Sequence, residues 1–304
     1  MPGVGEVLVH VQAAGLNSAD RLQVAGFYPA PPGSPSDIPG LELAGDVAAI
    51  GPGVERFVPG DRVMAVVGGG GQAELCVVHE RHLLPAGALS MTEAGGFPEA
   101  FTTAHDALFT QCGLTMGERV CVHGAAGGVG TAAVQLAVAA GARVVATVRN
   151  ADRWADVAEL GARVVAPEGF AAHGPFDVVL ELVGGPNLAA DIGALAPGGR
   201  ISVIGVGAGA NAEVNLLALM AARGRIHGST LRARPVHEKA TATAAVVAHV
   251  LPLIGMGLAA VFNGEALAPP PRIAAASIPL KIIKVQQCDN LTDGRQMSVR
   301  SRLC

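Results

Sequence analysis

The 304-residue chain is poor in aromatic residues, which make up 3% of it and include a single Trp and a single Tyr. Half of its residues are nevertheless hydrophobic. A core with so few aromatic rings must be filled mostly by Ala, Val, Leu and Ile, as in the buried parallel strands of α/β proteins. The chain is long enough for two domains with a sizeable core.

Basic clusters and long apolar runs are also missing. A net charge of -4 without a basic cluster argues against nucleic acid or an anionic membrane as the main partner. Gly, Arg or Asp interrupts the longest apolar stretches well before the about 20 residues that a membrane-spanning helix needs. The N-terminal residues show no basic region followed by an apolar core, so no secretory signal is visible. We therefore expect a cytoplasmic protein.

Cysteines are few and lack the spacing of a metal or disulfide framework. None of the five forms a C-x-x-C pair. They are predicted to be reduced thiols, mostly in the core: Cys76, Cys112, Cys121, Cys288 and Cys304.

The chain is organised around residues 118–153, where a glycine-rich turn stands between two strand-like runs. The run 119–123 alternates polar and apolar residues, and the run 143–148 follows an apolar stripe with helical spacing. The turn GAAGGVG fits the G-x-G-x-x-G frame of a dinucleotide site, with alanine in place of the first glycine. The predicted pyrophosphate-binding residues are Gly124, Ala125, Gly127, Gly128, Val129 and Gly130. The alternative is a tight strand-to-helix turn without a ligand.

The end of the second strand indicates which dinucleotide is bound. A NAD site usually places Asp or Glu about 20 residues after the glycines, where it binds the ribose 2′-hydroxyl. Here the strand ends Thr-Val-Arg-Asn, without a carboxylate. Arg149, Asn150 and Arg153 are suited to a 2′-phosphate, so the sequence favours NADPH. Alternatively the two arginines are ordinary solvated charges, and Asp152 stands nearby.

Strand and helix patterns alternate beyond this unit and predict a doubly wound parallel sheet. The expected helices are 152–160, 187–195 and 216–222, and the expected strands are 163–166, 177–182, 200–205 and 225–231. Gly184 and Gly205 stand at carboxyl ends of these strands, where open α/β sheets bind ligands. Ahead of the unit, short strands between Gly/Pro turns predict a small β-barrel. A long Gly/Pro-rich loop, 25–45, carries the only tyrosine and is of the length that is often functional.

Several motifs in this order resemble the medium-chain dehydrogenase/reductase superfamily, in its zinc-independent quinone oxidoreductase (zeta-crystallin-like) branch. The resemblance covers most of the chain, from about Gly5 to Phe262. It is carried by GLNSAD at 15–20, GLELAG at 40–45, GDRV at 60–63, PEAFTTA at 98–104, GAAGGVG at 124–130, LVGG at 182–185 and LRAR at 231–234. It implies a GroES-like β-barrel catalytic domain plus a doubly wound Rossmann sheet. We expect the catalytic domain at 1–98, the Rossmann NADPH-binding domain at 99–238, and a return to the catalytic domain at 239–304 with an atypical tail.

Zinc ligands are missing from the places where zinc alcohol dehydrogenases of this fold have them. Asn17 occupies the position of a zinc-binding Cys, and Leu41 occupies that of a zinc-binding His. Neither side chain suits a zinc site. Without a metal to hold a developing alkoxide, an ordinary ketone is a poor substrate. Quinones, and double bonds conjugated to a carbonyl, accept hydride more readily because the charge delocalises. The sequence therefore predicts an NADPH:quinone reductase without a metal.

By resemblance, Asn17, Tyr28 and Thr103 line the nicotinamide and quinone cleft as hydrogen-bonding residues, and Asp20 orders the loop. Each has a structural alternative: Asn17 as a helix cap, Tyr28 as a loop anchor, and Thr103 as a hydroxyl bonded to its own helix. Arg232 is placed with the cofactor, although it and Arg234 are equally suited to a dimer partner or to solvent. His123 and Trp154 are expected to pack in the interior.

Relatives of this branch usually begin further upstream and end in a helix and strand that are not recognisable after Phe262. We therefore expect a truncated N-terminus, a divergent C-terminus with a disordered tail, an unpaired barrel strand and low stability. The resemblance also implies a homodimer that pairs the edge strand 225–231. The partners expected are a quinone substrate, with no nucleic acid and no membrane. Two alternatives stay open: an enoyl-type reductase of the same superfamily, and a non-catalytic NADPH-binding protein with a structural or RNA-binding role.

Overall fold

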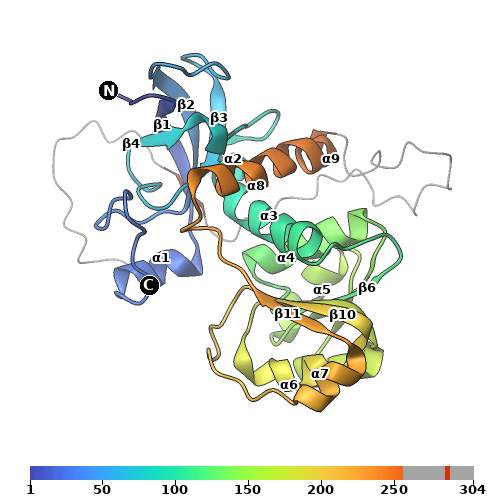
Figure 1. Cartoon of the computed structure of the whole chain (residues 1–304). Coiled ribbons are helices and arrows are strands. Elements are labelled where there is room, and N and C mark those ends of the chain that lie inside the picture. The colour runs from blue at the N-terminus through green and yellow to red at the C-terminus, as the bar shows by residue number, and fades with distance from the viewer. Residues whose placement is uncertain (256–284, 288–304) are drawn as a thin grey trace.

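The structure is a computed structural model that describes residues 1–255 and 285–287 (Figure 1). It contains two six-stranded sheets, one antiparallel and one parallel, with helices around them. The predicted fold class, a GroES-like barrel domain beside a Rossmann sheet, is confirmed. Among the described residues, every helix is too short or too polar to cross a membrane.

The antiparallel sheet comes from the N-terminal part of the chain, with one short strand added from near the C-terminus. Its strands are β1 (Glu6–Gly15), β2 (Glu42–Ile50), β3 (Arg62–Val66), β4 (Leu75–His79), β5 (Leu83–Pro85) and β12 (Val285–Gln287). Alternate residues of β1 are buried, as expected for a strand with one face on the core. Besides β2, β1 pairs with β4 along Glu6 to His10 and with β12 along Ala13 to Gly15. The predicted unpaired strand is therefore not found at β1.

The parallel sheet has the strand order β11-β10-β9-β6-β7-β8. Its strands are β6 (Arg119–Val122), β7 (Arg143–Thr147), β8 (Arg163–Val165), β9 (Phe176–Glu181), β10 (Leu195–Val203) and β11 (Arg225–Gly228). Within this sheet the chain first forms β6 and continues through β7 to β8 at one edge. It then crosses back to β9, which lies on the other side of β6. The carboxyl ends of β6 and β9 therefore form the topological switch point at which such sheets bind ligands.

The helices flank these two sheets. They are α1 (Ser18–Val24), α2 (Met91–Gly95), α3 (Pro98–His105), α4 (Gly128–Ala139), α5 (Trp154–Ala158), α6 (Gly185–Gly193), α7 (Leu216–Ala222), α8 (Val236–His249) and α9 (Leu251–Gly255). Short 3₁₀ segments are η1 (Glu80–His82), η3 (Ala151–Arg153) and η4 (Pro167–His173), and η2 (Asp106–Gln111) is a π-helical continuation of α3.

The predicted boundaries differ most from the structure at two places. Helix 187–195 ends at Gly193, and β10 already begins at Leu195, which pairs with Phe176 ahead of a register irregularity. The Pro-Gly-Gly run at 197–199 explains this irregularity, because such a run fits neither a helix nor a continuous ladder. Strand 225–231 stops at Gly228, because Leu231 leaves the sheet and packs on Val66 and Ala242.

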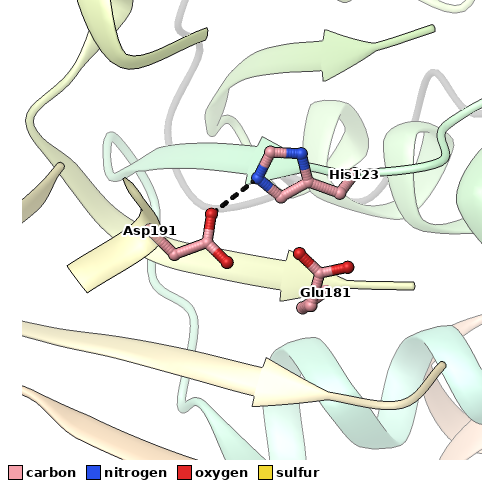
Figure 2. A group of neighbouring side chains, drawn as sticks. All are labelled: His123, Glu181 and Asp191. Atoms are coloured by element: carbon pink, nitrogen blue, oxygen red, sulfur yellow. Dashed lines mark hydrogen bonds and ion pairs between the residues drawn. The ribbon is translucent and has the colours of Figure 1, made fainter. Parts of the chain in front are cut away.

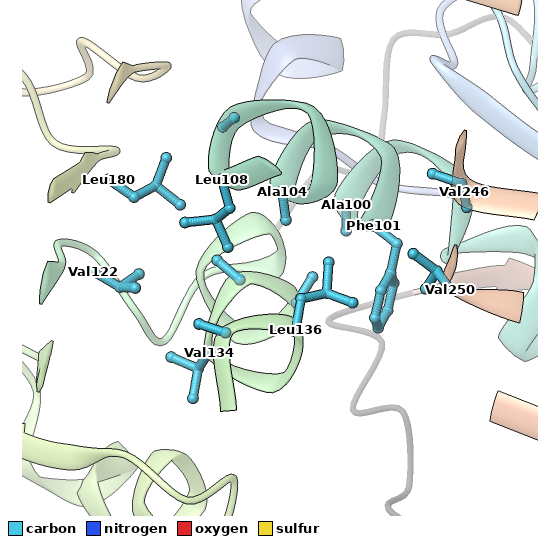
Figure 3. Packing of buried hydrophobic residues seen from close by; sticks show 14 of the residues in the cluster. Ala100, Phe101, Ala104, Leu108, Val122, Val134, Leu136, Leu180, Val246 and Val250 are labelled. Atoms are coloured by element: carbon cyan, nitrogen blue, oxygen red, sulfur yellow. The ribbon is translucent and has the colours of Figure 1, made fainter. Parts of the chain in front are cut away.

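One hydrophobic core joins the two sheets. Ala44 and Met64 of the antiparallel sheet belong to the same buried cluster as Val122 and Leu180 of the parallel sheet. Figure 3 shows α3 lying across α4 at its centre, with small residues such as Ala104 on the face between them, and with α8 alongside. Shared burial of apolar surface is the main force that holds such elements together. The two domains are therefore packed on each other around α3.

The boundaries 1–98, 99–238 and 239–304 stay a prediction. The tail that the sequence predicts to be atypical after Phe262 lies outside the described residues, apart from β12.

Candidate functional site

The glycine turn leads from β6 directly into the N-terminus of α4. Gly127 is the N-cap and forms no side-chain cap, and the first backbone N–H that bonds back into the helix is that of Thr131, to the carbonyl oxygen of Gly127 at 2.8 Å. The N–H groups of residues 128–130 therefore have no backbone partner in the part of the chain that the structure describes, as at helix N-termini that bind phosphate. Gly127 and Gly128 are exposed. The turn thus offers donors to an anion on its outer side.

Each residue of the turn has a separate steric role. A Cβ on Gly130 would lie 2.5 Å from the carbonyl oxygen of Gly124, so only glycine lets the helix pack this closely on the turn. The buried Ala125 donates its N–H to Thr147 of β7 at 3.1 Å, which fixes the turn to the neighbouring strand. A Cβ on Gly127 or Gly128 would meet nothing closer than 3.4 Å. The outer side of the turn is therefore open, and a dinucleotide pyrophosphate fits there.

The three residues predicted to hold a 2′-phosphate differ in whether their side chains already have a hydrogen-bond partner. Asn150 accepts the N–H of Asp152 at 3.1 Å, and Arg153 pairs with Asp156 at 3.0 Å. Arg149 is exposed and makes no hydrogen bond or ion pair with the described part of the chain. Among the three, Arg149 is the side chain best placed to meet an added phosphate.

Gly184 and Gly205 are explained by the packing of the chain itself. Gly184 has a φ of 120°, and a Cβ there would lie 2.6 Å from the carbonyl oxygen of Gly209. A Cβ on Gly205 would lie 2.4 Å from the carbonyl oxygen of Leu182. The turns after β9 and β10 therefore touch backbone to backbone, and these glycines are required whether or not a ligand is bound.

A buried polar cluster is formed by His123, Glu181 and Asp191, which come from the ends of β6 and β9 and from α6 (Figure 2). His123, which follows β6, makes a 2.8 Å hydrogen bond through Nε2 to Asp191 and a 3.0 Å bond through Nδ1 to Thr147. His123 is 1% exposed and lies edge-on to the ring of Phe170. The histidine is a packed residue within a hydrogen-bond network, as the sequence suggested.

Glu181 completes this cluster and shapes the turn after β9. Its Oε1 accepts the N–H groups of Val183 and Gly184, at 2.5 and 2.7 Å, and its Oε2 accepts the side chain of Asn187 at 3.0 Å. Burial raises the pKa of Glu181, and the neighbouring His123 and these hydrogen bonds oppose that rise. His123, Glu181 and Asp191 lie close enough to hold a metal ion, but the oxygens of Glu181 already face three N–H groups. We interpret the cluster as a support for the two turns.

On the opposite side of the site, Asn17 is the N-cap of α1, and its Nδ2 donates to Oε1 of Glu42 at 2.8 Å. Glu42 is 2% exposed, and its Oε2 accepts the N–H of Glu99 at 2.9 Å. Burial raises the pKa of Glu42 to about 8, against the lowering effect of these two hydrogen bonds. Leu41, in the other zinc-ligand position, is buried in the core. Neither an amide bonded to a carboxyl group nor a leucine suits zinc.

Asp20 orders the long loop, as predicted. Its carboxylate accepts the N–H of Asn17 at 2.8 Å and the N–H of Gly40 at 3.0 Å, so it ties the start of α1 to the end of the loop. Burial raises the pKa of Asp20, while these hydrogen bonds and the charge of Arg232 lower it.

Thr103 lies on α3 and is 9% exposed. Its hydroxyl lies near the carboxyl group of Glu99, whose pKa it lowers, and it makes no hydrogen bond to the backbone of its own helix among the described residues. One turn earlier, burial raises the pKa of Glu99 to about 7, and the charge of Lys239 opposes the rise. Buried groups with shifted pKa values often mark functional sites.

Arg232 is buried against the antiparallel domain, and its predicted role in cofactor binding stays a prediction. Its guanidinium donates to carbonyl oxygens of Tyr28 and Gly68 and to the side chain of Gln23, all in the antiparallel domain. Arg234 forms two hydrogen bonds to Asp106 at the end of α3, so it is not a solvent-facing residue.

The two sides of the site meet at α3. A Cβ on Gly128 of the cofactor turn would lie 4.0 Å from the Cβ of Ala100, which stands between Glu99 and Thr103 on that helix. Asn17 reaches the same helix through Glu42, and Tyr28 lies close enough for the charge of Glu99 to affect its pKa. Sequence reasoning proposed Asn17, Tyr28 and Thr103 for this site, which stays a prediction, and did not single out the carboxyl groups that surround it: Glu42, Glu99, Glu181 and Asp191. Each of these carboxylates stands in an otherwise apolar segment, and this pattern could have indicated a buried polar site.

Comparison with known proteins identifies both domains. Residues 3–111 match the family model of the alcohol dehydrogenase GroES-like domain, and residues 128–247 match that of the zinc-binding dehydrogenase. A quinone oxidoreductase of Lama guanicoe is 34% identical over 254 residues, which span 76% of this chain and 73% of that protein.

Parts of polyketide synthases are also similar. Erythronolide synthase EryA2 of Saccharopolyspora erythraea is 47% identical over 145 residues, which make up 47% of this chain. That synthase is far larger, and the chain spans only 4% of its length.

Two solved structures have the same fold over most of the chain. An alcohol dehydrogenase superfamily protein from Novosphingobium aromaticivorans superposes with a TM-score of 0.76 at 32% identity, covering 85% of this chain and 81% of that one. The CurK enoyl reductase superposes with a TM-score of 0.73 at 26% identity, covering 84% of this chain and 82% of that one. From its two domain models, its relatives and its fold, the chain belongs to the medium-chain dehydrogenase/reductase superfamily and is an oxidoreductase of the kind that binds a nicotinamide dinucleotide.

Proposed function

We propose that this protein is an NADPH-dependent reductase of quinones or similarly activated acceptors that works without zinc. The observation that carries the proposal is the meeting of an uncapped glycine turn with α3, opposite an Asn17–Glu42 pair in the place of zinc ligands. The similarity to a quinone oxidoreductase supports the choice of acceptor.

The N–H groups of residues 128–130 would hold the pyrophosphate, and Arg149 would meet the 2′-phosphate that distinguishes NADPH from NADH. When bound, NADPH supplies the hydride. The residues of this chain bind it, keep it over the carboxyl ends of the strands and exclude water from the acceptor.

An activated acceptor needs little chemical help from the protein. Charge that develops on a quinone spreads over the ring and both oxygens, so hydrogen-bond donors can take the place of a metal. Thr103 carries a buried hydroxyl on α3, and Tyr28 carries the phenol hydroxyl of the long loop. We propose that these hydroxyls and the Asn17 amide orient the acceptor, and that this orientation supplies much of the catalysis.

The proposal is tested by titrating the protein with NADPH and, separately, with NADH, followed by addition of 1,2-naphthoquinone. We expect tighter binding of NADPH and its oxidation once the quinone is added. Arg149→Glu should weaken NADPH binding by about tenfold or more, since it replaces an attraction for the 2′-phosphate by a repulsion. Arg163→Glu, an equally exposed position at the start of the neighbouring strand, is the matched control and should leave binding unchanged. Equal binding of the two nucleotides by the parent protein would contradict the NADPH assignment.

A second candidate, an enoyl reductase, is favoured by the similarity to the CurK enoyl reductase and to polyketide synthases. The two functions require the same cofactor site and differ in the acceptor. Parallel assays with 1,2-naphthoquinone and with an enoyl thioester distinguish them, and preferential reduction of the thioester would replace the first candidate by the second.

A further inference from the structure

Arg232 belongs to the parallel-sheet part of the chain but lies buried against the other domain. It follows β11 by four residues and is 3% exposed. Its Nε donates to the carbonyl oxygen of Gly68 at 2.8 Å, and one terminal nitrogen donates to that of Tyr28 at 2.9 Å. The other terminal nitrogen donates to the side chain of Gln23 on α1. One guanidinium therefore joins three separate segments of the antiparallel domain.

The same guanidinium also stacks on the side chain of Tyr28. Its central carbon lies 4.8 Å from the centre of the phenol ring, within the range of a cation–π interaction. Tyr28 is thus held by one residue at both its backbone and its ring. A planar fork with several donors can do this, whereas a lysine ammonium cannot satisfy three acceptors and the ring together.

The backbone of Arg232 is also held in place by its neighbours. The buried Lys239 on α8 donates from Nζ to the carbonyl oxygen of Arg232 at 3.0 Å. The preceding residue, Leu231, packs on Val66 and Ala242. Arg232 is therefore a rigid link between the end of the parallel sheet and the loop of Tyr28.

We propose that Arg232 is a positioning residue for the acceptor, which holds the ring of Tyr28 so that its hydroxyl faces the bound quinone or enone. This inference rests on the proposed function and moves Arg232 from the cofactor side, where the sequence placed it, to the acceptor side. The hydrogen bond to Gln23 also ties this residue to α1, the helix that Asn17 caps.

The charge of Arg232 supports this role. Burial raises the pKa of Tyr28, Arg232 opposes the rise, and Glu99 adds to it. Without Arg232, Glu99 would be the remaining charged neighbour, and the phenol would become a weaker hydrogen-bond donor to a developing oxyanion.

The experiment uses the full chain and takes advantage of its single tyrosine. With tyrosine ¹³C-labelled at Cζ alone, the NMR spectrum contains one tyrosine signal, which reports directly on Tyr28. We expect this signal to move toward its position in the unfolded chain in Arg232→Gln, and to a smaller extent in Arg232→Lys. Arg21→Gln, an exposed arginine on α1, is the matched control and should leave the signal in place.

Kinetic measurements then separate positioning from a direct cofactor role. In Arg232→Lys we expect kcat for 1,2-naphthoquinone to fall by about tenfold, since small misplacements of orienting groups cost rate, while the dissociation constant of NADPH stays the same. In a Tyr28→Phe background the same substitution should cost little further, because both changes act through one hydroxyl.

Weaker NADPH binding with an unmoved tyrosine signal would overturn the proposal and return Arg232 to the cofactor. Unchanged kcat in a folded Arg232→Lys variant whose tyrosine signal has moved would also overturn it. If the parent protein reduces neither 1,2-naphthoquinone nor an enoyl thioester, the proposed function has failed. The tyrosine signal then decides by itself whether Arg232 holds Tyr28.

Discussion

The two sides of the site are built in different ways. The cofactor side is one short turn, 124–130, whose glycines and helix start are contiguous in the sequence. The acceptor side is assembled from α1, a long loop, β2, α3 and the segment after β11, which contribute Asn17, Tyr28, Glu42, Glu99 and Arg232. A contiguous site can be read from a motif, whereas a dispersed one depends on the way in which the domains pack.

Both sides nevertheless rest on buried carboxyl groups. Glu181 and Asp191 lie under the cofactor turns, and Glu42 lies under Asn17. If this comparison is correct, substitutions in the two supports should differ in their consequences. The cofactor support should govern stability, and the acceptor support should govern the response to pH.

The largest effect is expected from Asp191→Ala, which removes the carboxylate that is paired with the buried His123. Breaking a buried, hydrogen-bonded pair should lower the free energy of unfolding by about 3 kcal/mol, as measured by denaturant unfolding. Asp156→Ala is the control, because its pair with Arg153 is about one-third exposed and exposed pairs contribute less than about 1 kcal/mol. Equal losses in the two variants would show that the buried cluster is not a support.

Two alanine substitutions divide the cofactor turn into a packing part and a binding part. Gly130→Ala places a Cβ 2.5 Å from the carbonyl oxygen of Gly124, so we expect a loss of about 2 kcal/mol in unfolding free energy. Gly127→Ala adds a Cβ on the open side of the turn, at an extended φ of -81°. It should leave thermal stability nearly unchanged and weaken NADPH binding by about tenfold.

Gly193→Ala, where an added Cβ would meet no atom outside its own helix turn within 4 Å, controls for the loss of glycine itself. A Gly127→Ala protein that binds NADPH as tightly as the parent protein would place the pyrophosphate elsewhere.

The buried carboxyl group of the acceptor side should make the stability of the protein depend on pH. The pKa of Glu42, about 8 in the folded protein, lies above the usual value of a carboxyl group, so the folded protein keeps a proton that the unfolded chain releases. The free energy of unfolding should therefore fall as pH rises from about 5 to about 8, by up to about 1.4 kcal/mol per pH unit. Glu99, with a pKa of about 7, adds to the same slope.

Glu42→Gln imitates the protonated form, and the Asn17 amide can turn over to accept its new donor. This variant should match the parent protein in stability near pH 5, exceed it near pH 8 and show a shallower slope, as measured by denaturant unfolding at several pH values. A slope that is unchanged in Glu42→Gln would mean that Glu42 stays ionised in the fold.

The smallest change in stability is expected from Thr103→Val, which removes a buried hydroxyl that makes no hydrogen bond to the backbone of its own helix. Stability should change by less than about 0.5 kcal/mol, while turnover of 1,2-naphthoquinone should fall several-fold. Thr102→Val is a matched control, because its hydroxyl is equally buried and unpartnered. Similar kinetics in both variants would remove Thr103 from the acceptor site.

Sequence reasoning worked best where structure is local. The turn 124–130, helix 216–222 and most strands of the parallel sheet follow from periodicity and glycine spacing, which act over a few residues. It failed at Leu195, where pairing with Phe176 outweighs helical spacing, and at Leu231, which leaves the sheet for a contact with the other domain. Tertiary contacts decided both positions.

By itself, the sequence determined the two-sheet fold, the position of the dinucleotide turn and the absence of zinc-ligand side chains at residues 17 and 41. Each of these depends on residue type and spacing along the chain. Only the tertiary structure decided which partners the buried charges take. Arg232 was predicted to face the cofactor, and its buried position against Tyr28 follows from packing of the two domains. A buried charge must find its partners in space, and spacing along the chain does not say where they are.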